Sequence, residues 1–124
     1  MHRDLKPQNI MLESVFDPFI KLIDFGYSLD FSQKLPEDIK NLISPWIMGT
    51  FAYTAPEQIE NRGKFDEQFQ LESDMWSLGV IIFFLISAKH PFHGKSEQDL
   101  FNKIMSCDYD FDPESDWINV SKDC

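Results

Sequence analysis

The 124-residue sequence has little cysteine, few basic side chains and no long apolar stretch. Two cysteines, Cys107 and Cys124, are too few for a disulfide scaffold, so we expect a reducing, intracellular (cytoplasmic) location. Lys and Arg number 11 against 21 Asp and Glu, and the net charge of −10 disfavours nucleic acid or an anionic membrane as partner. The longest apolar run, Leu78 to Ile86, is too short to cross a bilayer. These shortages predict a soluble protein.

Hydrophobic residues make up 43% of the chain and aromatic residues 15%, which is typical of a globular unit. Two β-type stretches, 10–12 and 19–23, predict a hairpin preceded by a polar loop. The proline-punctuated stretch 27–57 reads as irregular, with a short helix near 36–43. The sequence predicts a mainly α fold with one small β-hairpin.

Two further helices are expected in the second half of the chain. Residues 74–87 are apolar on nearly every side, which predicts a helix buried all round and capped by Ser73 or Asp74. We place Trp76, Ile81, Phe84 and Leu85 of this helix in the core. Residues 96–106 have the spacing of an amphipathic helix.

Residues 2–9, His-Arg-Asp-Leu-Lys-Pro-Gln-Asn, put a carboxylate, an amine and an amide on one short loop. Phosphoryl transfer to a hydroxyl needs a carboxylate to accept the proton, a cation near the moving group and oxygen ligands for Mg²⁺. Asp4, Lys6 and Asn9 are of these three types in turn. Asp24, in the triplet Asp-Phe-Gly at 24–26, supplies a second oxygen ligand after the hairpin.

Two more blocks follow, at 49–57 and 73–79, and the order of all four carries more information than any one alone. In this order the chain resembles the C-terminal lobe of a eukaryotic Ser/Thr protein kinase catalytic domain, the whole of which is an α+β fold. The resemblance implies a partial kinase domain over 1–124, with a catalytic loop at 2–9, an activation segment at 24–57 and a buried helix at about 74–87. The Lys-Pro pair after Asp-Leu is similar to Ser/Thr kinases, and the tail from 108 to 121 is similar to the calcium/calmodulin-dependent or calcium-dependent group.

The resemblance implies a function for individual residues, with ATP and Mg²⁺ as cofactors and a protein bearing Ser or Thr as substrate. Asp4 is then the catalytic base and Lys6 the cation that steadies the γ-phosphate. Asn9 and Asp24 are the implied metal ligands, and Met11 lies beneath the adenine ring.

Other implied roles are regulatory or structural. Arg3 would pair with a phosphorylated activation loop, in which Thr50 and Thr54 are candidate hydroxyls. The structural positions are His2, Phe25, Gly26, Glu57 and Asp74, with Asp74 anchoring a spine that contains His2 and Phe25, and Glu57 forming an ion pair.

The sequence departs from the family pattern in lacking a glycine-rich phosphate loop, a strand lysine and the helix glutamate that pairs with it. We therefore expect a kinase fragment, incomplete at both ends and inactive alone. The alternative is a pseudokinase-like binding module that acts without catalysis. His90 and His93 lack further ligands at metal-site spacing, so we interpret both as surface histidines.

Overall fold

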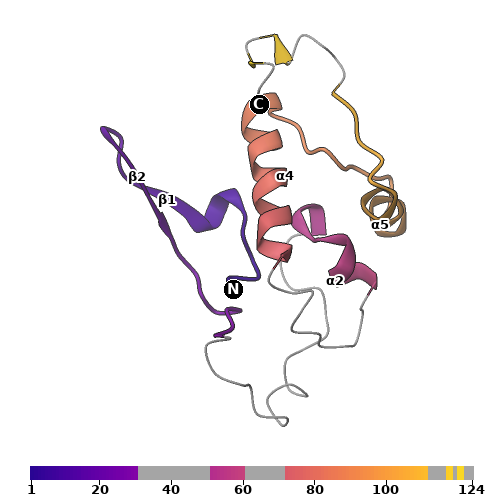
Figure 1. Cartoon of the computed structure of the whole chain (residues 1–124), viewed down its shortest axis with the longest axis horizontal. Coiled ribbons are helices and arrows are strands. Elements are labelled where there is room, and N and C mark those ends of the chain that lie inside the picture. Colours follow the sequence, from indigo (N-terminus) through magenta and orange to yellow (C-terminus); the bar gives the residue numbers. More distant parts are fainter. Residues whose placement is uncertain (31–50, 61–71, 112–116, 119, 122–124) are drawn as a thin grey trace.

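The computed structural model describes residues 1–30, 51–60, 72–111, 117–118 and 120–121. The secondary-structure elements are η1 (Pro7–Asn9), β1 (Ile10–Ser14), β2 (Asp17–Leu22), η2 (Phe51–Tyr53), α2 (Pro56–Glu60), α4 (Ser73–Ser87) and α5 (Glu97–Ser106). Figure 1 shows α4 at the centre, with the hairpin on one side and α2 and α5 on the other. The described part is mainly α with one two-stranded sheet, as the sequence predicts. The expected helix near 36–43 lies outside it.

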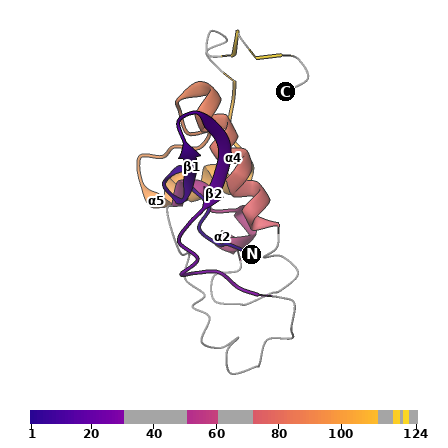
Figure 2. The same ribbon diagram turned by 90° about the vertical axis from the view of Figure 1, so that its left-hand side faces the viewer.

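The hairpin β1–β2 is antiparallel and pairs Ile10 with Leu22 and Leu12 with Ile20. Its register shifts by a bulge between Leu12 and Ser14, close to the turn. The strands pass in front of α4 when this side faces the viewer (Figure 2). Most of the hairpin is exposed, and Phe16 at its tip is 98% exposed. The hairpin therefore joins the rest of the molecule mainly through its base.

Helix α4 begins within one residue of the expected start, but its burial differs from the expectation. Leu85 is 70% exposed and Met75 and Ile82 are exposed as well, whereas Val80 and Ile81 are buried. The expectation of burial on every side is therefore wrong. The other described elements pack against only part of the surface of this apolar helix. Leu85 is likewise not a core residue.

The first turn of α4 lacks the predicted side-chain cap, and the helix ends at a residue with left-handed backbone geometry. The residue at the N-cap is Glu72, which makes no side-chain capping bond, so the predicted cap at Ser73 or Asp74 is wrong. At the other end Ala88 adopts a left-handed φ of 57° and donates its N–H to the Phe84 carbonyl at 2.8 Å. Glycine is the residue that usually takes this conformation.

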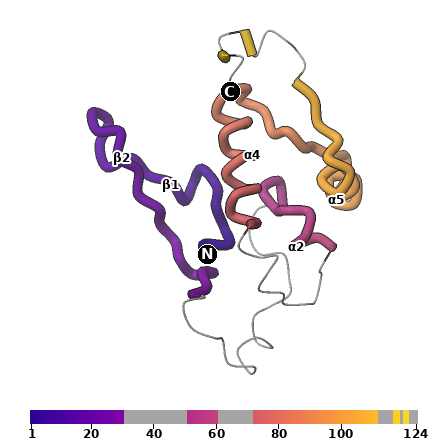
Figure 3. Tube along the Cα trace, in the orientation of Figure 1, coloured from indigo at the N-terminus to yellow at the C-terminus, as the bar shows by residue number. Residues whose placement is uncertain are grey.

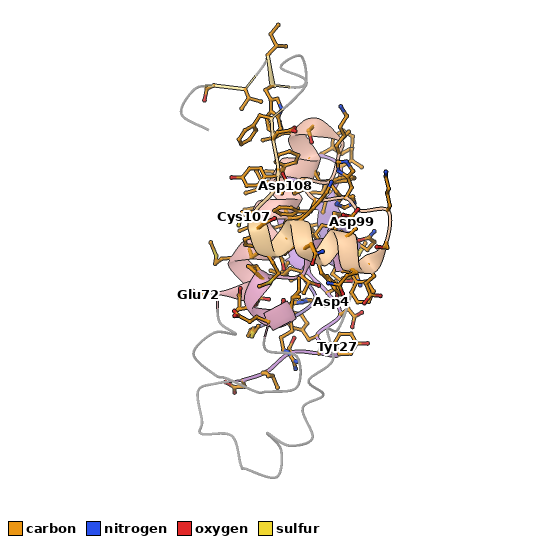
Figure 4. The ribbon with its side chains drawn as sticks, turned by 90° about the vertical axis from the view of Figure 1, so that its right-hand side faces the viewer. Asp4, Tyr27, Glu72, Asp99, Cys107 and Asp108 are labelled. Atoms are coloured by element: carbon orange, nitrogen blue, oxygen red, sulfur yellow. The ribbon has the colours of Figure 1, made fainter. Side chains whose placement is uncertain are left out.

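Helix α5 is amphipathic, as its spacing predicts. Ser96 caps it by accepting the Asp99 N–H at 3.2 Å, and the acidic residues of its first turn favour the positive end of the helix dipole. Phe101 and Ile104 are buried on one face. Figure 4 views the molecule from this side, with Asp99 and Cys107 marking opposite ends of α5.

The core lies where α4, α5, η2 and α2 meet. Figure 3 shows α2 and α5 on the same side of α4. Its buried members are Tyr53, Ile59, Val80, Ile81, Phe92, Phe101 and Ile104. Leu5 packs against this cluster from the loop at 2–9. The core therefore supports that loop directly. None of the helices in the described ranges has the length and apolar character needed to cross a membrane.

Candidate active site

The loop at 2–9 brings Asp4, Lys6 and Asn9 together. The Lys6 ammonium lies 2.7 Å from Asp4 Oδ2, and the Asn9 amide nitrogen donates to the same oxygen at 3.1 Å and to the Asp4 carbonyl at 2.8 Å. Pro7 opens the single turn η1, whose geometry it favours, and the turn returns Asn9 to Asp4. The Asp4 side chain is 4% exposed. A buried carboxylate is thus held by one cation and one amide.

A second set of bonds fixes the start of this loop. The His2 ring donates from Nε2 to the Ile23 carbonyl at 3.0 Å, so its Nδ1 is an acceptor and receives the Asp4 N–H at 3.3 Å. Asp74, on α4, accepts the N–H groups of His2 and Arg3 at 2.6 and 2.9 Å. Arg3 has a φ of 70°, which is uncommon for a residue with a side chain. The bonds to Asp74 hold this backbone in place.

Asp24, Phe25 and Gly26 form a tight turn next to the loop. The Ile23 N–H donates to the Asn9 carbonyl at 3.0 Å, which joins the residue before Asp24 to Asn9. The exposed Asp24 has a φ of 62° and accepts the Gly26 N–H at 3.3 Å. A Cβ at Gly26 would lie 3.2 Å from Asp24 Oδ1, so a larger residue would crowd the turn. The ring of Phe25 lies 5.0 Å from that of His2.

The donor atoms of Asn9 and Asp24 suit a hard cation. Within the described ranges no group of three His, Cys, Asp or Glu side chains forms a metal site. Mg²⁺ often binds to one or two protein oxygens and takes its other ligands from water and substrate phosphates. The side-chain nitrogen of Asn9 donates to Asp4, and the side-chain oxygen Oδ1 takes no part in those bonds. Two oxygen-bearing side chains therefore fit Mg²⁺ chemistry.

The remaining residues expected to bind the nucleotide or regulate activity lie in different environments. Met11, on β1, is exposed. Thr54 is 4% exposed, so a kinase could phosphorylate it only after this segment opens. Thr50 lies outside the described residues. The Arg3 Nε is buried and finds no hydrogen-bond partner in the described part of the chain. Burial lowers the pKa of the Arg3 guanidinium, and the Asp74 carboxylate partly opposes this shift.

Two serines near the site were not predicted as functional. Ser73 donates its hydroxyl to Glu57 at 3.0 Å, so this carboxylate has a partner on α4 besides any arginine. Ser77, one turn further along α4, donates to the Tyr53 carbonyl at 2.8 Å. Both serines belong to the block at 73–79 that the sequence singles out, but nothing in a sequence shows which carbonyl a hydroxyl reaches. They join α4 to the segment 53–57.

His90 is half-buried, so the prediction of a surface histidine is met only in part. Its ring is stacked on Phe84 with centroids 5.0 Å apart and meets the Tyr53 ring edge-on at 5.3 Å. Its Nδ1 is buried without a partner among the described residues, and burial lowers its pKa. The sequence does not show this partial burial, because both aromatic neighbours come close only in the folded chain. His93 is exposed, as expected.

Comparison with known proteins agrees with the four sequence blocks. Residues 1–124 match the family described as Protein kinase domain. The chain is 41% identical over 115 residues to human death-associated protein kinase 2, covering 91% of this chain and 28% of that protein. It is 40% identical over 116 residues to calcium-dependent protein kinase 4 of Plasmodium falciparum, covering 90% of this chain and 19% of the relative.

Myosin light chain kinase A of Dictyostelium discoideum is 36% identical over 124 residues, with 99% of this chain and 38% of the relative covered. The chain thus spans well under half the length of each of these relatives. The match to the family nevertheless extends over all of residues 1–124. The chain belongs to the protein kinase domain family.

Proposed function

We propose that the protein is an ATP-dependent serine/threonine protein kinase, and that residues 1–124 form the C-terminal lobe of its catalytic domain. The catalytic loop is then 2–9 and the activation segment 24–57. One observation supports this most strongly. The buried Asp4 carboxylate is shared by Lys6 and Asn9 on a loop that Asp74 ties to α4.

The proposed reaction transfers the γ-phosphoryl group of ATP to a Ser or Thr hydroxyl. The hydroxyl oxygen forms a bond to the γ-phosphorus, the bond from that phosphorus to the bridging oxygen breaks, and ADP leaves. Asp4 orients the hydroxyl and accepts its proton, and Oδ1 is available because Lys6 and Asn9 both engage Oδ2. The Lys6 ammonium, 2.7 Å from Asp4 Oδ2, would balance negative charge on the moving group.

Asn9 and Asp24 are the residues that would hold Mg²⁺. The metal, when bound, neutralises charge on the nucleotide phosphates. Asn9 also keeps Asp4 oriented through its amide nitrogen, so it links the metal ligands to the base. Asp24 is held in its turn by the Gly26 N–H.

The test of this proposal uses the protein expressed from its own gene. ATP labelled at the γ-phosphate is supplied with Mg²⁺ and with peptides that contain Ser, Thr or Tyr as the only hydroxyl. We expect label on the Ser and Thr peptides, and its loss when EDTA removes the metal. Residues 1–124 alone are expected to transfer none, since this sequence contains no glycine-rich phosphate loop. Label on the Tyr peptide alone, or transfer unaffected by EDTA, would contradict the assignment. No transfer by the natural protein would favour the non-catalytic binding module.

A further inference from the structure

Tyr53 is held against α4 from two directions. The Ser77 hydroxyl donates to its backbone carbonyl at 2.8 Å. The His90 ring, which follows the end of α4, packs edge-on against its side chain with centroids 5.3 Å apart and planes at 78°. The first contact holds the backbone of η2 and the second holds the Tyr53 side chain. Together they restrict both the position of η2 and the rotation of the Tyr53 ring.

The Ser77 contact lies in the interior. Both Ser77 and Tyr53 are buried, and the same hydroxyl lies 3.1 Å from the Ser73 carbonyl one turn back. A serine in a helix commonly bonds only to that carbonyl of its own helix. Here the bond to Tyr53 is the shorter of the two. Without the hydroxyl, the buried Tyr53 carbonyl would lose this donor.

The His90 contact is aromatic on both sides. Phe84 stacks on one face at an interplanar angle of 27°, and Tyr53 meets the ring at a steep angle. Such arrangements depend on ring shape and on a neutral apolar surface. A phenylalanine could replace this packing, and an alanine could not.

The segment that contains Tyr53 and the loop at 2–9 both contribute to one hydrophobic cluster. Tyr53 belongs to the buried core cluster, and Leu5, between Asp4 and Lys6, packs against that cluster. The Thr54 N–H bonds to the Phe51 carbonyl within η2, and the bond from Ser73 to Glu57 is a second link between this segment and α4. A shift of Tyr53 would therefore disturb the cluster against which Leu5 packs.

We infer that Ser77 and His90 are positioning residues, which hold η2 through Tyr53 and thereby keep Asp4 and Lys6 in place. The effect on Asp4 rests on the proposed kinase function, whereas the effect on η2 does not. Neither residue contacts Asp4, Lys6 or Asn9 in the bonds described above. Their influence passes through Tyr53, the core and Leu5.

The test compares two pairs of variants in the protein expressed from its own gene. Ser77→Thr and Ser77→Val have nearly the same shape, but only threonine keeps the hydroxyl. His90→Phe keeps an aromatic ring and His90→Ala removes it. Ser106→Ala is the control, since Ser106 donates to the Asn102 carbonyl at 2.9 Å on the exposed side of α5.

Two readouts separate this inference from the proposed function. Hydrogen exchange at the amides of 54–59 should rise about tenfold or more in Ser77→Val and His90→Ala, the size expected for loss of a buried bond or ring contact. Ser77→Thr, His90→Phe and Ser106→Ala should exchange as the wild type does. The kcat for a Ser peptide should fall in the first two variants and return in the conservative ones.

Unchanged exchange at 54–59 in Ser77→Val and His90→Ala would overturn the inference, as would an equal rise in Ser106→Ala. Normal kcat in variants whose exchange has risen would also overturn it. Changed exchange in a protein that phosphorylates nothing would support the hold on η2 and contradict the kinase function instead.

Discussion

The carboxylate of Asp74 accepts the backbone N–H of His2 at 2.6 Å, although 72 residues separate them in the sequence. The other oxygen of the same carboxylate accepts the Arg3 N–H at 2.9 Å. One side chain on α4 thus satisfies two consecutive N–H groups of the loop that carries Asp4. The position of that loop depends on the helix.

Replacing Asp74 should destabilise the protein. Asp74→Ala leaves both N–H groups without an acceptor, and we expect the free energy of unfolding to fall by about 2–4 kcal/mol. Asp74→Asn keeps one acceptor oxygen and should cost less. Urea unfolding measures the difference, with the exposed Asp108→Ala as the control (Figure 4). An Asp74→Ala protein as stable as the control would contradict the described bonds.

Replacing Gly79 or Gly94 by alanine should change the stability of the protein in opposite directions. A Cβ at Gly79, inside α4, would meet no atom within 4 Å, so Gly79→Ala should raise stability by about 0.5–1 kcal/mol through helix propensity. A Cβ at Gly94 would lie 2.4 Å from the Leu100 backbone nitrogen, so Gly94→Ala should lower stability by about 1–3 kcal/mol. Thermal unfolding of both variants tests the pair. Equal effects would show that the start of α5 is placed differently.

Protonation of His90 should weaken the fold. Burial lowers its pKa in the folded protein, so the unfolded chain binds the proton more readily and stability falls as the pH drops below about 6.5. The ionisable groups on the elements around it are Tyr53 of η2, Asp74 at the far end of α4, and Lys89 and His93 on its own segment. Tyr53 is neutral in this range, since the ordinary pKa of tyrosine is about 10 and burial raises it further.

Unfolding free energies measured from about pH 5 to 7.5 test this effect. His90→Phe should flatten the slope over this range, and the exposed His93→Gln should leave the slope as it is. A slope that persists in His90→Phe would assign the pH dependence to another group.

Much of the fold could be predicted because local patterns determine it. Two β-type stretches in the sequence predicted the hairpin, and helical spacing predicted α5, whose Phe101 and Ile104 are buried on one face. The burial of α4 could not be predicted, because an apolar sequence does not show which sides find neighbours. Leu85 is exposed for this reason.

In the candidate site, too, only the features that are local in the sequence could be predicted. Asp4, Lys6 and Asn9 are close in sequence, so their chemistry could be predicted together, and the structure places them within hydrogen-bonding distance. Their catalytic roles stay predictions. The aromatic neighbours of His90 and the bond from Ser77 to Tyr53 join distant segments, so no local pattern indicates them.

The most direct test of the account is the kcat of Asp4→Asn in the protein expressed from its own gene. Asparagine keeps the shape of the side chain and loses the base, so we predict a fall of about 10²–10⁴-fold in phosphorylation of a Ser peptide. Asp108→Asn, an exposed carboxamide substitution outside the site, should retain the wild-type rate. Wild-type turnover in a folded Asp4→Asn protein would contradict the assignment of Asp4 as the catalytic base.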